Sequence, residues 1–443
     1  MTETFDMALI QRGARLRRSP YFEATLRAGC RSYTVYNHMF LPTRYDDLHA
    51  EYEKLLTGVT VWDVSVERQV EITGPDAFEF TNLLTPRDLS KCAVGQGKYV
   101  LITAGDGGIV NDPVLLRLAE NHFWLALADS DVLLYAKGIA LNAGLDVEVR
   151  EPDVSPMQVQ GPKSKEVVRR LFGEDILELR YYWFLETDLD GIPVVVTRTG
   201  WSGEVGYEIY LRDGTRGVEL WDRVMEAGRD LGISPTGPSD IRRIEAGILN
   251  YGVDMTLDTN PYEVGLGWQV DFDQEADFIG REALARIAEE GPRRRLAGIE
   301  LSGAPLDLNM DRWPVRRDGE EMGFVTSAVY SPRLGRNLGY AMVPAASGEL
   351  GTRLSVTTPD GERDATVVPR PFVDPGKEIP KSPFVARPPR QPAARASTSS
   401  PNSCSQPPTL SWRSLSVRKP RSTRRRIVPP PARWVSVHST VVL

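Results

Sequence analysis

The chain contains one local sequence pattern twice, and this repeat limits the folds that it can adopt. In each copy a strand-like apolar segment runs into Gly-Pro and then into a helix-like segment, first at residues 72–77 and again at 157–164. Further short strand-like segments follow both copies. Two copies of strand, Gly-Pro, helix and β-meander predict a pseudo-duplicated, antiparallel α+β core and not a parallel βαβ sheet.

The second copy leads to a glycine-rich hairpin at residues 199–211. Gly200, Gly203 and Gly206 are spaced by three and follow an apolar, β-branched strand segment. Such spacing predicts a tight loop in which the backbone adopts positive φ or lies close to a ligand.

Glu208 lies on the strand that follows this loop, and two interpretations of it stay open. Strand alternation places it on the face opposite Tyr207 and Ile209. It is either a surface carboxylate on an exposed strand face, or a buried one that accepts hydrogen bonds from a flat nitrogen heterocycle beside Trp201.

The sequence divides into three regions. Residues 1–290 are expected to form the α+β core, as two subdomains that divide near residue 150. Short strands with turn signals predict a small β-barrel over residues 291–380. Residues 381–443 are rich in Pro, Ser and Arg and contain no Asp or Glu, which predicts a disordered basic tail.

Composition and charge exclude several functional classes. The net charge of −7 includes 12 Lys and Arg in the tail, so residues 1–380 carry −19 and would repel nucleic acid. No apolar run approaches the ~20 residues of a membrane-spanning helix, and the N-terminus lacks the pattern of a secretory signal. Three widely spaced cysteines indicate a reducing compartment. We therefore expect a cytoplasmic monomer or homodimer without nucleic-acid or membrane partners.

Common catalytic motifs are absent from the sequence. There is no GxGxxG after a strand and no Walker lysine loop, so nucleotide-phosphate binding has no support. Residues 200–204 miss the G-x-S-x-G elbow, because the fifth residue is Glu204 and no helix-like segment follows. Four histidines without an HExxH or CxxC motif argue against zinc and against a Ser-His-Asp triad. We expect no metal site.

A set of single polar residues remains, on strands and loops that are rich in aromatic side chains: Tyr99, Asn111, Asp112, Glu208 and Arg243. Such a set suits binding of a flat polar cofactor and positioning of a small substrate. Each residue also has a purely structural interpretation. Asn111 and Asp112 precede a proline, as in a turn, Arg243 fits a solvated helix face or an ion pair, and Tyr99 fits core packing.

The order of these segments resembles that of the folate-dependent aminomethyltransferase family, which includes the T-protein of glycine cleavage. The matching segments are residues 62–65, 107–112, 159–162, 200–209, 243–247, 277–284 and 325–332. The resemblance implies a three-domain cloverleaf with tetrahydrofolate in a central channel. It also implies that Glu208, Trp201, Tyr99 and Arg243 bind this cofactor, and that the catalytic residues are Asn111 and Asp112.

Within this family the chain is most similar to the dimethylsulfoniopropionate demethylase branch. The segments that carry this similarity are residues 33–39, 86–89, 180–183, 260–263 and 377–380. The branch transfers a methyl group from a sulfonium to N5 of tetrahydrofolate. Three alternatives stay open: an O-demethylase of methoxylated aromatics, an aminomethyltransferase, and a non-catalytic folate-binding scaffold.

A sulfonium substrate makes specific demands on a binding site. Because its leaving group is neutral, methyl transfer needs orientation more than a strong acid. A small-molecule donor that is cationic at sulfur and anionic at its carboxylate requires an aromatic wall and a cationic side chain. The sequence offers Tyr36 and Trp183, together with Trp201, for the wall, and Arg17 or Arg18 for the counter-charge.

Overall fold

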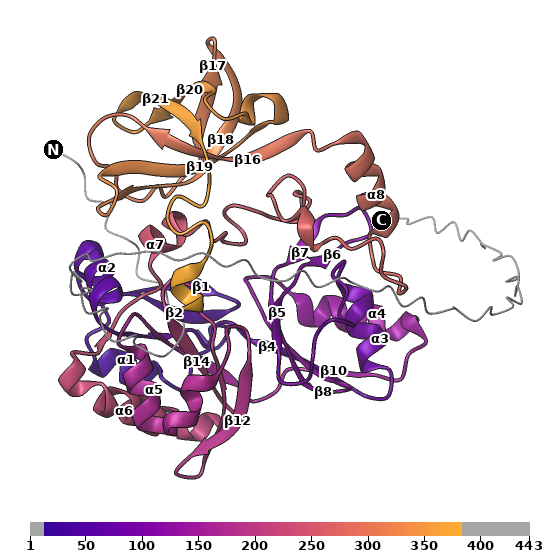
Figure 1. Ribbon diagram of the computed structural model, residues 1–443, viewed down its shortest axis with the longest axis vertical. Coiled ribbons are helices and arrows are strands. Elements are labelled where there is room, and N and C mark those ends of the chain that lie inside the picture. The colour runs from indigo at the N-terminus through magenta and orange to yellow at the C-terminus, as the bar shows by residue number, and fades with distance from the viewer. Residues whose placement is uncertain (1–12, 383–443) are drawn as a thin grey trace, which may run out of the picture. The chain divides into compact units, whose positions relative to one another are not determined.

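The computed structural model describes residues 13–382, which contain two open sheets and a closed β-barrel (Figure 1). Apart from its first two residues, the predicted disordered tail at 381–443 lies outside the described residues. Within the described part, no helix has both the length and the apolar character needed to cross a bilayer.

The larger open sheet has the strand order β12-β13-β14-β11-β3-β15. Its strands are β3 (Thr60–Asp63), β11 (Ser155–Gln160), β12 (Phe184–Leu189), β13 (Ile192–Thr197), β14 (Gly206–Leu211) and β15 (Ser234–Pro235). One face carries the apolar side chains that pack against helices α1 (Phe22–Arg27), α5 (Ser164–Phe172) and α6 (Gly217–Ala227). Strand β3 precedes the division expected near residue 150, but it pairs with β11, which follows that division.

The smaller open sheet has the strand order β10-β4-β9-β8-β5 and is antiparallel. Its strands are β4 (Gln69–Thr73), β5 (Gly97–Tyr99), β8 (Val114–Ala119), β9 (His122–Ala126) and β10 (Glu148–Arg150). Helices α3 (Ala77–Leu84) and α4 (Val132–Ala143) cover one face. Through its other face it contacts the larger sheet, where Trp124 packs in one cluster with Val195 and Tyr210.

The barrel closes in the order β16-β19-β18-β17-β20-β21. Its strands are β16 (Arg294–Leu301), β17 (Trp313–Arg317), β18 (Glu320–Ser331), β19 (Arg336–Pro344), β20 (Arg353–Thr358) and β21 (Gly361–Val368). Helix α8 (Arg281–Glu290) precedes it, and α9 (Glu378–Lys381) ends the described chain. The predicted α+β class, the duplicated strand–helix units and the C-terminal barrel are confirmed.

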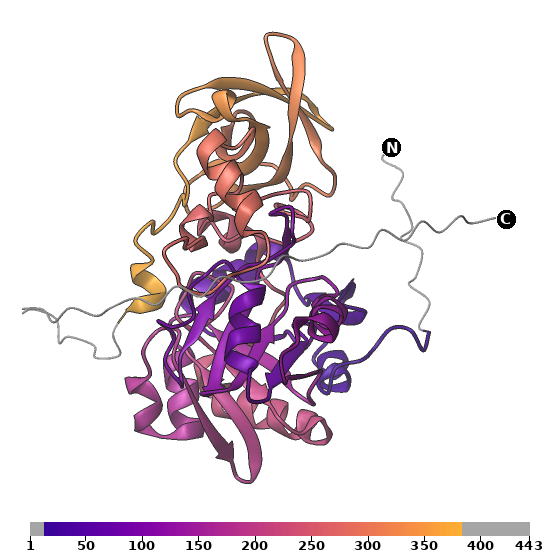
Figure 2. The same ribbon diagram turned by 90° about the vertical axis from the view of Figure 1, so that its right-hand side faces the viewer.

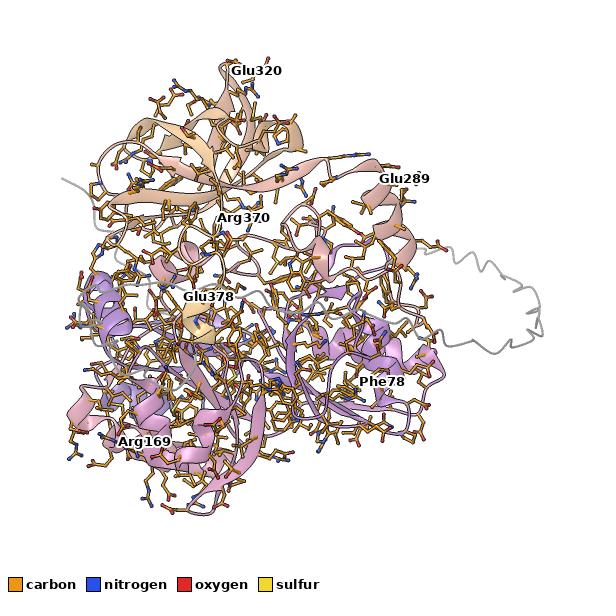
Figure 3. The ribbon with its side chains drawn as sticks, in the orientation of Figure 1. Phe78, Arg169, Glu289, Glu320, Arg370 and Glu378 are labelled. Atoms are coloured by element: carbon orange, nitrogen blue, oxygen red, sulfur yellow. The ribbon has the colours of Figure 1, made fainter. Side chains whose placement is uncertain are left out.

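Three shorter elements connect these layers. The hairpin of β1 (Ser32–Tyr36) and β2 (Met39–Arg44) and the small pair of β6 (Ile102–Thr103) and β7 (Ile109–Asn111) border the core, as does α2 (Leu48–Thr57). After β21 the chain leaves the barrel and descends along the core to α9, as Figure 2 shows. There the Phe372 amide donates to the Glu245 carbonyl over 3.0 Å, and Arg370 lies at the base of the barrel (Figure 3).

Helix α7 (Asp240–Glu245) links the barrel to the core. Ser239 caps it, because its hydroxyl accepts a hydrogen bond from the Arg242 amide over 3.3 Å. The sequence pattern predicts a helix over residues 239–250 that is capped by Ser239, and the observed helix is shorter. It ends before Gly247, whose φ of +71° is incompatible with a continuing right-handed helix.

Candidate active site

A row of side chains crosses the larger sheet on the face that looks toward the smaller sheet. Paired positions in adjacent strands place Trp62, Gln158, Glu208 and Thr197 side by side across β3, β11, β14 and β13. Directly paired residues of antiparallel strands share a face, so the register alone establishes this row. Glu208 is only 3% exposed, which decides between the two interpretations in favour of a buried carboxylate.

The Glu208 carboxylate is held by hydroxyl and amide donors of its own sheet. Its Oε2 accepts from Tyr210 over 3.0 Å, from Thr197 over 3.3 Å and from Thr199 over a short contact. Its Oε1 accepts from Gln158 Nε2 over 2.6 Å. Burial raises the pKa of this carboxyl, while the four donors oppose the shift. Oε1 therefore keeps one acceptor position for a ligand.

The glycine loop before β14 is shaped by Gln160, which is fully buried. A Cβ at Gly200 or Gly206 would lie 2.2 or 2.1 Å from the Gln160 Oε1, so a side chain at either position would have to displace this buried amide. Of the three glycines, only Gly203 has positive φ, at +66°. At Gly200 and Gly206, the close backbone approach that the sequence predicted is therefore an approach to the Gln160 side chain. The loop carries Trp201, whose amide donates to the Gln158 Oε1 over 3.4 Å.

Tyr99 and Asp112 form the second half of the site. The Tyr99 hydroxyl donates to the Asp112 Oδ2 over 2.9 Å, and Oδ1 is buried without a partner among the described residues. Burial raises the pKa of Asp112 to about 7, and the charge of Asp254 adds to the shift. Asp112 therefore changes protonation near neutral pH, as a proton-transfer group requires.

Asn111 has a different environment from its neighbour. Its side chain is fully buried, donates to the Ala128 carbonyl over 3.0 Å and to the Ser130 hydroxyl over 2.8 Å, and accepts from the Ala128 amide over 3.0 Å. Both of its N–H donors are thus used within the protein. These bonds fix the loop after β9, and the catalytic role that the resemblance implied for Asn111 stays a prediction.

The N-terminal hairpin brings Tyr36 to the same place. Asn37, at the hairpin tip, donates to the Val66 carbonyl over 3.0 Å, and its amide donates to Asp129 over 2.7 Å. The first bond ties the tip to the β3–β4 turn, and the second ties it to the loop after β9. Burial raises the pKa of the Tyr36 hydroxyl well above its usual range, and the nearby carboxylates of Asp112 and Glu67 raise it further.

Trp183 and the two N-terminal arginines lie elsewhere. The Arg180 guanidinium stacks 3.9 Å above the Trp183 ring centroid, and Arg180 is exposed. Arg17 pairs with Glu151 at 2.6 Å, and the half-exposed Arg18 lies over Phe22. The structure brings none of the three against Glu208 or Asp112.

Sequence reasoning did not single out Tyr181 and Tyr182, which precede β12. Their rings meet edge to face at 4.7 Å, and the charge of Glu208 raises the pKa of both hydroxyls beyond the larger effect of burial. Tyr182 has φ of +64°, an uncommon conformation for a non-glycine residue that is frequent at functional sites. No pattern in the sequence distinguishes these tyrosines from core residues.

Arg243 is buried and makes ion pairs within the protein. It contacts Asp240 at 2.8 Å and Asp254 at 2.6 Å, and it lies 5.6 Å from the Trp201 ring centroid. Arg370 is the more available cation. It makes no ion pair within the described residues, and its guanidinium donates to the Val264 carbonyl. Burial lowers the pKa of Arg370, while Tyr99 and Asp254 lie close enough to raise it.

A small hollow of about 20 Å³ lies beside the glycine loop, between α7 and the segment that leads to α9. Its walls include Tyr181, Gly200, Gly203, Arg242 and Lys377. Among residues 13–382, no three His, Cys, Asp or Glu side chains are arranged to hold a metal ion. The arrangement can bind a planar, hydrogen-bonding ligand between aromatic rings and carboxylates.

Comparison with known proteins accounts for this arrangement. The model of the GCVT N-terminal domain matches residues 21–274, and that of the glycine cleavage T-protein C-terminal barrel domain matches residues 294–374. The chain belongs to the glycine cleavage T-protein family. The family predicted from the order of sequence segments is therefore confirmed.

Relatives within the T-protein family differ in their activities. Dimethylsulfoniopropionate demethylase DmdA from Ruegeria pomeroyi is 43% identical over 361 residues, which cover 82% of this chain and 98% of the relative. An aminomethyltransferase from Symbiobacterium thermophilum is 33% identical, over 81% of this chain and 97% of that protein. The glycine cleavage system aminomethyltransferase T from Bartonella henselae superimposes with a TM-score of 0.73 at 25% identity, over 81% and 98% of the two chains. The expected T-protein fold is thus confirmed.

Tetrahydrofolate is the cofactor of this family, and the residues present fit it. The pterin edge carries amino and ring N–H donors, which require acceptors in a buried site. The free position on Glu208 Oε1 and the unpartnered Asp112 Oδ1 are such acceptors. Trp201, Tyr181 and Tyr182 supply aromatic surface beside them.

Proposed function

We propose that this chain transfers a methyl group from dimethylsulfoniopropionate to N5 of tetrahydrofolate, giving 5-methyltetrahydrofolate and 3-methylthiopropionate. The observation that carries the proposal is the 43% identity to the Ruegeria pomeroyi demethylase, over 98% of that protein. The aminomethyltransferase from Symbiobacterium thermophilum shares only 33% with the chain.

The site residues have roles that suit this reaction. Bound tetrahydrofolate supplies N5 as the nucleophile that receives the methyl group. Glu208 and Gln158 hold the donor edge of the cofactor, and Trp201 lies against it. Methylation of a secondary amine releases one proton. Asp112 accepts this proton, because its pKa of about 7 and its unpartnered Oδ1 make it a base at neutral pH.

The substrate needs an aromatic contact for its sulfonium and a cation for its carboxylate. Tyr36 supports the first role, because the charges of Asp112 and Glu67 raise the pKa of its hydroxyl and the bond from Asn37 to the Val66 carbonyl holds its hairpin against the turn that carries Glu67. Arg370 supports the second better than Arg17 or Arg18, since Arg17 is already paired with Glu151. The side chains of Arg370 and Tyr36 thus replace the N-terminal arginines and Trp183 as the donor-binding pair.

The test is an anaerobic incubation of the protein with tetrahydrofolate and one methyl donor at a time. Dimethylsulfoniopropionate should yield equal amounts of 5-methyltetrahydrofolate and 3-methylthiopropionate, measured by chromatography. A methoxylated aromatic such as vanillate, and an aminomethyl donor, serve as the competing substrates. Product from either of these, with none from the sulfonium, would overturn the proposal.

A further inference from the structure

Glu67 lies at a fixed position between the two sheets. It follows β3 on the turn that leads into β4, where its amide donates to the Val64 carbonyl over 2.9 Å. The Gln69 side chain donates to the Glu67 carbonyl, and Asn37 donates to the neighbouring Val66 carbonyl over 3.0 Å. Three contacts therefore hold the backbone that presents this carboxyl group.

The Glu67 carboxyl has almost no partner of its own. Its one hydrogen bond within the described residues is a long 3.5 Å contact from Gln158 Nε2, which donates to Glu208 over 2.6 Å. The adjacent Arg68 turns away and binds Glu151. A partly buried carboxyl group without a strong donor or cation is costly to the fold, and such groups concentrate at functional sites.

The groups that face Glu67 are acidic or phenolic. Asp112 from the β7 end and Glu208 from β14 raise its pKa by their charge, beyond the larger effect of burial. Tyr36 from the N-terminal hairpin and Tyr210 from β14 are near enough that Glu67 raises the pKa of their hydroxyls. No lysine or arginine among the described residues lowers the pKa of Glu67.

We propose that Glu67, with the Tyr36 ring beside it, recognises the positive charge of the methyl donor and makes the site specific for cationic donors. The inference rests on the proposed function and names the residue that separates a sulfonium from a neutral methoxy donor. A bound onium ion favours the ionised form of Glu67, which burial and the neighbouring acids disfavour, and an aromatic ring attracts the same positive charge. Among the described residues, no group of three His, Cys, Asp or Glu side chains is placed to hold a metal ion.

Glu67 acts in binding and not in the transfer step. The positive charge leaves sulfur as the methyl group moves, so a carboxylate beside it favours the bound substrate over the transition state. Glu67→Gln should therefore raise KM for dimethylsulfoniopropionate about tenfold without lowering kcat. A structural defect would instead lower kcat as well.

The direct experiment measures binding without folate, so that no turnover is needed. Isothermal titration compares dimethylsulfoniopropionate and glycine betaine, which are cationic, with 3-methylthiopropionate, which lacks the positive charge. Wild type should bind the cationic pair more tightly. Glu67→Gln should weaken that pair about tenfold and leave 3-methylthiopropionate unchanged, and Glu67→Asp should restore part of the difference. Glu79→Gln, an exposed acid on α3, is the matched control.

Equal affinities of wild type and Glu67→Gln for the cationic ligands would overturn the inference. So would an equal loss for charged and uncharged ligands, or no binding of any cationic ligand to the wild type. A lowered melting temperature identifies a variant with a folding defect. If Glu67→Gln has such a defect, Glu67→Asp is compared with the wild type in its place. Because these titrations use no tetrahydrofolate, selective cation binding without formation of 5-methyltetrahydrofolate would refute the proposed function alone.

Discussion

The hydroxyl of Tyr99 donates a hydrogen bond to Oδ2 of Asp112 over 2.9 Å, and it leaves the buried Oδ1 of that carboxylate without a partner. A carboxylate fixed through one oxygen, with the other one free, is oriented to accept a proton from a bound ligand. This pair joins β5 to the end of β7, so the smaller sheet positions the base.

Replacement of Asp112 tests its role as a base. Asp112→Asn should lower kcat for methyl transfer by about 10²-fold or more, in the range of general-base contributions. In the wild type, kcat should rise with pH through about 7, because the ionised form accepts the proton. Tyr99→Phe removes a hydrogen bond that favours the ionised form and should move this midpoint upward. A pH-independent wild-type rate would refute the assignment.

The same residue should make stability depend on pH. The folded-state pKa of Asp112 is about 7, well above the usual value for an aspartate, so the stabilising effect of its proton is lost as pH rises toward and through 7. Asp112→Asn should therefore stabilise the protein at pH 8, on the order of 1–2 kcal/mol, and much less at pH 4. Urea unfolding at the two pH values measures this. An equal effect at both would contradict it.

Glu208 is expected to determine cofactor affinity. Glu208→Gln replaces an acceptor by an amide and should weaken tetrahydrofolate binding about 10- to 100-fold. Fluorescence titration with folate alone provides the measurement, with Glu79→Gln as the control. Unchanged affinity would show that the Glu208 carboxylate is a structural group, held only by its four donors.

The aromatic wall should depend on Tyr36 and not on Trp183. Tyr36→Ala should raise KM for dimethylsulfoniopropionate about tenfold, because it removes a ring beside Glu67 and Asp112. Trp183→Ala should leave KM within about twofold, since the Trp183 ring stacks with the exposed Arg180. Steady-state kinetics of both variants decide this, and the opposite ranking would restore Trp183 as the wall.

The glycine loop should not tolerate a methyl group at Gly206. A Cβ there would lie 2.1 Å from the buried Gln160 side chain, so Gly206→Ala should destabilise the protein by about 1–3 kcal/mol. Gly138→Ala is the matched control. Gly138 lies within α4 with nothing near its Cβ position, and alanine there should stabilise by about 0.5–1 kcal/mol. Thermal unfolding of the two variants compares them, and similar melting temperatures would contradict the argument.

Local patterns in the sequence were sufficient for much of the fold. Strand alternation placed Glu208 and Tyr210 on one face of β14, and Ser239 marked the start of α7. The pairing of β3 with β11 was not predictable from such patterns. It joins residues about a hundred positions apart, and no local propensity encodes a contact of that separation.

For the candidate site, too, some features follow from local sequence patterns and others depend on tertiary contacts. The order of short segments was enough to identify the family and the cofactor, while the importance of Glu208 and Asp112 stays a prediction. Individual roles could not be assigned, because they depend on which hydrogen bonds each side chain has already made. Asn111 and Asp112 are adjacent in sequence, yet the first is fully bonded within the protein and the second keeps a free oxygen.

The sequence by itself determined the element order, the two repeated units and the barrel, since periodicity and turn residues are local properties. Only the tertiary structure decided which charged groups meet. It brings Glu67, Asp112 and Glu208 together from three separate segments, and it turns Arg17 and Arg68 toward Glu151. Burial and neighbouring charge set the pKa of an acid, and both exist only once the chain is packed.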